Sequence, residues 1–188
     1  MTGLTSLNLS SFDTSNVTNM CGMFANCQQL DNINISHFKT KKVTDMSHMF
    51  YNCKFSELKL SNFNTINVKN MSHMFNECKN LTKIDLSSFD TCNVTNMYGM
   101  FANCPILLNL DISNFNTENV TDMGQMFLGS KKLKIILLGK NYIINNETNT
   151  YQILNTLPLD VKITAIESTR DKLIEASNLT EKNFEILK

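Results

Sequence analysis

The chain has 188 residues, of which 42% are apolar, so it is long enough to bury a substantial core. Its 17 basic and 17 acidic side chains give a formal net charge of zero, which offers no electrostatic argument for binding nucleic acid or an anionic membrane. No apolar run approaches the roughly 20 residues of a membrane helix, and the first ten residues lack the basic and apolar regions of a signal peptide. We therefore predict no transmembrane segment and no nucleic-acid partner.

One stretch of sequence is used five times. It first appears complete at residues 4–27 as LTSLNLSSFDTSNVTNMCGMFANC, and one apolar position marks each copy: Phe24, Phe50, Phe75, Phe101 and Phe127. Self-similarity at a period of 25 or 26 residues predicts a solenoid, in which neighbouring repeats share a core. Leu4 is already in register, which suggests a segment of a longer protein; a natural start at Met1 is the alternative.

The first half of each repeat has the pattern of a strand. Leu4, Leu7 and Leu9 are followed by polar residues in an alternation of period two, and later copies keep apolar residues at the same positions within 30–35, 55–60, 81–86 and 107–112. A sixth copy begins at 133–138. We predict that these strands stack into a parallel sheet on one face of the solenoid.

The second half of each repeat has a different spacing. Its apolar residues are separated by 3, 3, 1 and 3 positions, in the first copy at Val17, Met20, Met23, Phe24 and Cys27. This spacing is typical of one face of a short helix. The complete repeat therefore predicts an α/β solenoid, with a parallel sheet on one side and short helices on the other.

The last fifty residues depart from the repeat. Residues 161–165 alternate like a short strand and residues 168–179 have the composition of a helix. A solenoid needs a polar-faced terminal unit to cover its last repeat. We predict two regions, a repeat solenoid at 1–138 and a small α/β cap at 139–188; an independent small binding domain at 139–188 is the alternative.

The consensus LxxLxLSxFxTxxVTxMxxMFxxCxxL, which covers about residues 4–138, resembles the BspA-like leucine-rich-repeat surface proteins, in the form found in mycoplasma lipoproteins. The resemblance implies a leucine-rich-repeat fold, location at the cell surface or outside the cell, and a role in adhesion or protein–protein binding, with a host or matrix protein as partner. It implies no enzyme activity and no cofactor. A virion or intracellular location stays open.

Cysteine and histidine are the residues whose chemistry needs an interpretation. Cys27, Cys53, Cys78 and Cys104 share one repeat position at the end of an apolar stripe, where a cysteine behaves as a small hydrophobic residue. We favour buried free thiols, with disulfides or a metal site as alternatives. His48 and His73 also share a position; we favour solvated imidazoles, with a shared metal ion as the alternative. No catalytic, cofactor or metal site is predicted.

Two surfaces are candidates for binding. The first is the outward face of the predicted strands: Ser6, Asn8, Asn32, Asn34, Glu57, Lys59, Lys83, Asp85, Asn109 and Asp111. The second is an apolar N-terminal end at which the chain is expected to self-associate, most simply as a homodimer: Leu7, Leu9, Val17, Met20, Met23 and Phe24. The strand face favours a non-enzymatic interaction module, and a merely solvated face is its alternative. The apolar end favours a structural building block of a surface layer or virion that assembles end to end.

Overall fold

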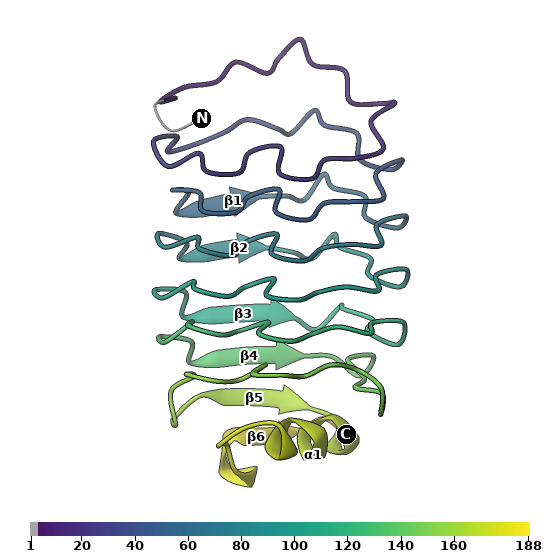
Figure 1. Ribbon diagram of the computed structural model, residues 1–188, viewed down its shortest axis with the longest axis vertical. Coiled ribbons are helices and arrows are strands. Elements are labelled where there is room, and N and C mark those ends of the chain that lie inside the picture. Colours follow the sequence, from purple (N-terminus) through teal and green to yellow (C-terminus); the bar gives the residue numbers. More distant parts are fainter. Residues whose placement is uncertain (1–3) are drawn as a thin grey trace.

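The computed structural model describes residues 4–188, so residues 1–3 of the predicted solenoid lie outside the described part. The chain winds into a parallel β-solenoid, and Figure 1 shows its coils stacked along the long axis from the N-terminal end to the C-terminal end. Almost none of the chain is helical: one α-helix lies at the C-terminal end. The prediction of a solenoid with a parallel sheet is confirmed.

The strands form two parallel sheets. The first pairs β1 (Glu57–Lys59) with β2 (Lys83–Asp85), and the second runs in the order β3 (Asn109–Ile112), β4 (Ile135–Leu138), β5 (Lys162–Ala165) and β6 (Phe184–Ile186). Equivalent repeat positions are register partners, as in the pair Leu58 and Ile84. Residues 4–9 and 30–35, which were predicted as strands, follow the same coil path but contain no regular strand.

Side chains alternate along each strand between the core and the surface. In β3, Leu110 and Ile112 are buried, whereas Asn109 and Asp111 are exposed. The same alternation is present in β1, where Leu58 is buried between two exposed residues. The predicted strand phase is therefore right, and the outward face of the sheet is the polar one.

The short helices predicted for the second half of each repeat are wrong: these segments are series of turns. Their amides alternate between two kinds of acceptor. The Phe24 N–H donates to the Met49 carbonyl of the next coil at 2.9 Å, whereas the Met23 N–H donates to the Met20 carbonyl three residues back at 3.2 Å. A helix of about two turns is marginal on its own. The stacked coils offer every second amide a partner in the neighbouring coil, so the helix does not form.

Two residues of each turn segment have left-handed backbone conformation, four positions apart. In the second coil these are His48, with φ of 56°, and Asn52, with φ of 54°. In the first coil, Gly22 and Asn26 have φ of 62°. An α-helix needs negative φ throughout. A left-handed residue at every fourth position therefore excludes a helix. The buried apolar residues nevertheless keep the spacing that suggested a helix.

The core is a set of stacked side-chain columns. Adjacent rings of the marker phenylalanines have centroids 5.5 to 6.3 Å apart and planes within 17° of parallel. All five rings are at most 1% exposed. Offset stacking adds about 0.5–1.5 kcal/mol per aromatic pair to the free energy gained by burial. This column joins the coils into one continuous core.

The repeat pattern continues past residue 138 in the structure. Asn149 forms a parallel bridge with Asp122, and Gln152 and Thr156 have the two left-handed positions of another turn segment. The predicted strand at 161–165 is β5, and the predicted helix at 168–179 is α1 (Glu167–Glu175). A 3-10 turn (Glu181–Asn183) leads into β6. The division of the chain into a solenoid at 1–138 and a cap at 139–188 stays a prediction.

Candidate functional site

All ten residues predicted for the strand face are exposed, and they lie in rows that cross neighbouring coils. In the first sheet, Glu57 is the register partner of Lys83 and Lys59 is the partner of Asp85. Figure 1 shows β1 to β5 one below another, so the rows follow the long axis of the solenoid. The structure therefore brings the predicted residues together on one surface. Their role in binding stays a prediction.

Four of these ten residues have a local structural role. A side-chain oxygen accepts a hydrogen bond from the backbone N–H of the serine two residues later, at 3.0 to 3.2 Å, in Asn8, Asn34, Asp85 and Asp111. This is the bond of an Asx turn, which ends the strand. Hydrogen bonds from Ser87 also lower the pKa of Asp85 below its ordinary value. The turn therefore explains these four residues without a ligand.

Two apolar residues of the same face were missed by the sequence analysis. Ile135 and Leu137 occupy the outward positions of β4, and Ile135 is 43% exposed. They line a shallow depression on the face together with Lys83, Ile84, Asn109 and Asp111. The signal was present, because residues 133–138 were recognised as a sixth strand copy, but the predicted face ended with the fifth. The strand face is thus polar in its first part and has an apolar spot at β4.

The turn side carries a row of aromatic and imidazole rings. The His48 and His73 ring centroids lie 4.7 Å apart, Tyr51 lies beside His48 at 5.7 Å, and Tyr98 beside His73 at 5.2 Å. The His73 Nδ1 atom lies 2.6 Å from the Asn76 amide nitrogen. Burial, and secondarily the neighbouring His48, lowers the pKa of His73. Within residues 4–188 no group of three or more His, Cys, Asp or Glu side chains is arranged to hold a metal ion.

The glycine at the next position of this row leaves room for the His73 ring. Gly99 has φ of 59°, and a Cβ atom there would lie 2.8 Å from the His73 Nδ1 atom. The His73 ring therefore covers the backbone of the following coil, which explains its partial burial.

The four cysteines of the repeat position are buried free thiols. Each Sγ of the later three lies near a backbone carbonyl of the preceding coil, as between Cys104 and Phe75 at 3.2 Å. Ser130 takes this position in the fifth copy and donates to the Phe101 carbonyl at 2.7 Å. Burial raises the pKa of Cys104 to about 12, so its reactive thiolate form is suppressed at neutral pH. The later three thiols therefore act as hydrogen-bond donors that join neighbouring coils.

The N-terminal end is only partly apolar at its surface. Leu9, Met20 and Phe24 are buried by the coil that follows, and Leu7, Val17 and Met23 are partly buried. Phe12 is 51% exposed, whereas its equivalent Phe38 in the next repeat is 2% exposed. Self-association through this end stays a prediction.

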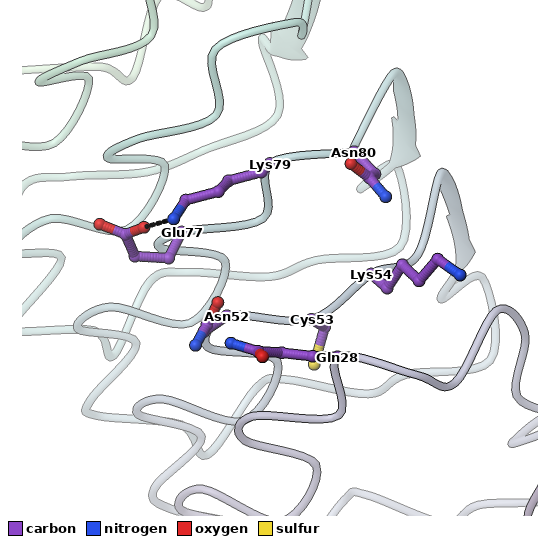
Figure 2. A pocket seen from close by; sticks show the side chains of 7 residues that line it. All are labelled: Gln28, Asn52, Cys53, Lys54, Glu77, Lys79 and Asn80. Carbon is purple, nitrogen blue, oxygen red and sulfur yellow. Dashed lines mark ion pairs between the residues drawn. The ribbon is translucent and has the colours of Figure 1, made fainter. Parts of the chain in front are cut away.

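One pocket lies at the bend between the turn segment and the strand side (Figure 2). It has a volume of about 280 Å³ and is lined by Gln28, Asn52, Cys53, Lys54, Glu77, Lys79 and Asn80. Glu77 and Lys79 form an ion pair across 3.0 Å on one of its walls. The Cys53 side chain is buried in the core, where its thiol donates to the Phe24 carbonyl. Burial raises the pKa of this thiol, so the pocket offers no activated nucleophile. Its polar, open lining lacks the apolar enclosure of a small-molecule site.

No helix within residues 4–188 has the length and apolar character required to cross a membrane. The stacked parallel coils define a repeat solenoid protein. The chain belongs to the family described as "Mycoplasma protein of unknown function, DUF285", whose profile matches residues 2–79 and 33–142. A search of curated proteins found no significant match, and a search of solved structures found none.

Proposed function

We propose that this chain is a non-enzymatic, BspA-like leucine-rich-repeat module that binds a protein partner through its strand face, in adhesion to a host or matrix protein. Cell-surface or extracellular location is part of this proposal and rests on the sequence resemblance. The family description assigns no function, so the proposal depends on the geometry of the surface.

The observation that supports the proposal most is the ordered, exposed strand face. Outward side chains of successive strands remain in register and exposed, as for Glu57 and Lys83. Solenoids commonly bind partners on such repeated surfaces. The Asx turns explain the residues at the strand ends, but the outward row of Asn32, Glu57, Lys83 and Asn109 has no such role. That row is free to contact a partner.

Binding to immobilised fibronectin, collagen, laminin and cultured epithelial cells tests the proposal. We expect the chain to bind at least one of these, and the double variant Glu57→Lys, Lys83→Glu to bind more weakly although its net charge is unchanged. A matched charge exchange away from the face, Lys140→Glu with Glu147→Lys, should leave binding unchanged, since both residues are exposed. Absence of binding to every coated surface would contradict the proposal. Equal binding by the parent chain, the double variant and the control variant would also contradict it.

The polarity of the backbone ladder supports a second candidate, the structural building block that assembles end to end. In the turn segments, alternate amides of each coil donate to carbonyls of the next coil, as from Phe75 to Met100 at 2.9 Å. Within residues 4–188, the Cys21 and Met23 carbonyls accept no such bond, and the Gln152 and Leu154 amides donate none. The turn segment of the first coil therefore offers acceptors and that of the last coil offers donors, which suits a head-to-tail contact between turn segments.

A coil supplied by a longer chain would satisfy the same groups, so the test is made on the protein in solution. Light scattering over a concentration series should show growing assemblies, and Phe12→Lys, at a half-exposed residue of the first coil, should abolish them. A monomer at all concentrations would rule out this second candidate.

A further inference from the structure

The apolar spot at β4 joins a basic row of the strand face, which contains Ile135, to an acidic row, which contains Leu137. Ile135 is exposed between Asn109 of β3 and Lys162 of β5, which are its register partners. Lys134 precedes it and Lys83 lines the same depression. All three lysines are exposed, and none forms a salt bridge within residues 4–188. The Lys162 Nζ atom donates only to the Lys182 carbonyl, at 2.9 Å.

Two carboxylates near this spot, those of Asp85 and Asp111, accept hydrogen bonds from their own turns. Asp111 is the register partner of Leu137, and it accepts the Ser113 N–H at 3.0 Å. Asp85 accepts both the N–H and the hydroxyl of Ser87, at 3.0 and 2.7 Å. These bonds hold both carboxylates against their own turns. Asp111 and Glu185 lie in the row of Leu137, so the row of Ile135 keeps the positive charge of its lysines.

We propose that β2 to β5 dock a segment of a protein partner that places an apolar side chain on Ile135 and Leu137 and carboxylates on Lys83, Lys134 and Lys162. This inference rests on the proposed function and names the chemistry of the partner. Charge complementarity selects an acidic segment, and the apolar spot supplies the anchor. An anchor in a desolvated centre surrounded by polar contacts is the usual arrangement of a binding hot spot.

The size of the spot favours an extended segment over a large folded surface. The spot consists of the two outward side chains of β4. Their register partners in β3 and β5 are polar. An extended segment can place one side chain on β4 and reach the lysines of the neighbouring coils, because adjacent strands are only about 4.8 Å apart.

Selection from a phage library of random dodecapeptides tests the inference, with the intact chain as bait and an unrelated protein as counter-selection. We expect the enriched peptides to contain a Leu, Ile or Phe beside Asp or Glu. Their affinity should fall at least about tenfold in Ile135→Asp and in Lys162→Glu. It should be unchanged in two matched controls away from the face, Leu159→Asp and Lys140→Glu. Leu159 is suitable because it is 78% exposed.

The outcomes separate this inference from the proposed function. Enriched peptides that bind Ile135→Asp normally but lose affinity in Glu57→Lys would preserve the strand face as a binding surface and overturn the β4 anchor. Enrichment of basic peptides, or no enrichment, would also overturn it. Melting temperatures of all variants within a few degrees of the parent would show that the losses are not due to unfolding.

Discussion

The stacked phenylalanine column is the part of the core whose contribution is easiest to test. Phe75 is fully buried, and its ring stacks between Phe50, at a centroid distance of 5.7 Å, and Phe101, at 5.5 Å. A buried aromatic side chain removes roughly 150–250 Å² from water. At about 25 cal/mol per Å² this contributes about 4–6 kcal/mol. Alanine retains part of that burial, so Phe75→Ala should lower the free energy of unfolding by about 3–5 kcal/mol.

Urea unfolding followed by circular dichroism measures this loss from the midpoint and slope of the transition. Phe12→Ala is the matched control: its ring is half exposed, and the expected loss is below about 1 kcal/mol. If Phe75→Ala does not fold, Phe75→Leu should still fold with a smaller loss than alanine. A loss below about 1 kcal/mol for Phe75→Ala would refute the reasoning that the repeats share one core through this column.

Three further predictions concern thiols, glycines and pH. Thiol labelling at pH 8 should modify the exposed Cys21 quickly, Cys92 more slowly because a hydrogen bond with Asp90 raises its pKa, and the four buried cysteines only after denaturation; rapid labelling of four or more in the folded protein would contradict the burial. Gly139→Ala should cost about 3 kcal/mol because its Cβ would collide with the Ser113 carbonyl oxygen. Gly22→Ala, which suffers only left-handed strain, should cost about 1 kcal/mol, and the reverse order in urea unfolding would be unexpected. The folded-state pKa of His73 lies below its ordinary value of 6.5. The fold therefore favours the neutral ring, and the free energy of unfolding decreases as the pH falls below 6.5 toward the lower pKa. The stability of the parent should therefore fall more than that of His73→Gln between pH 7.5 and pH 5, and equal losses would speak against it.

The strands could be predicted from the sequence because their signal is local and has a single meaning. Alternation with period two placed Leu58 and Leu110 inward, and the constant repeat length placed equivalent residues in register. The strand face followed from the same alternation. Its extension to Ile135 and Leu137 needed only the sixth copy of the pattern.

The turn segments could not be predicted from spacing alone. A helix and a series of turns with a left-handed residue at every fourth position both place Met20, Phe24 and Cys27 on one side. The choice depends on hydrogen bonds between coils, such as that from Phe24 to Met49, which no single repeat contains. A clue was the residue type at the left-handed positions, where Asn and Gly recur.

The role of some candidate residues also depended on the structure. Asn8 and Asp111 were predicted for the partner face from their exposure, and the structure shows them closing Asx turns. Sequence alternation reports on which side a residue lies, but it does not report which backbone amide it faces.

A nuclear magnetic resonance titration tests the central claim, that a partner binds on the strand face, most directly. The titrant is the tightest peptide from the library selection, added to the ¹⁵N-labelled chain. Binding on this face predicts that amide resonances of β2 (Lys83–Asp85) to β5 (Lys162–Ala165) shift with the peptide, while those of the turn segments 46–53 and 97–104 keep their positions. Shifts confined to the turn segments, with the strand resonances unchanged, would contradict it.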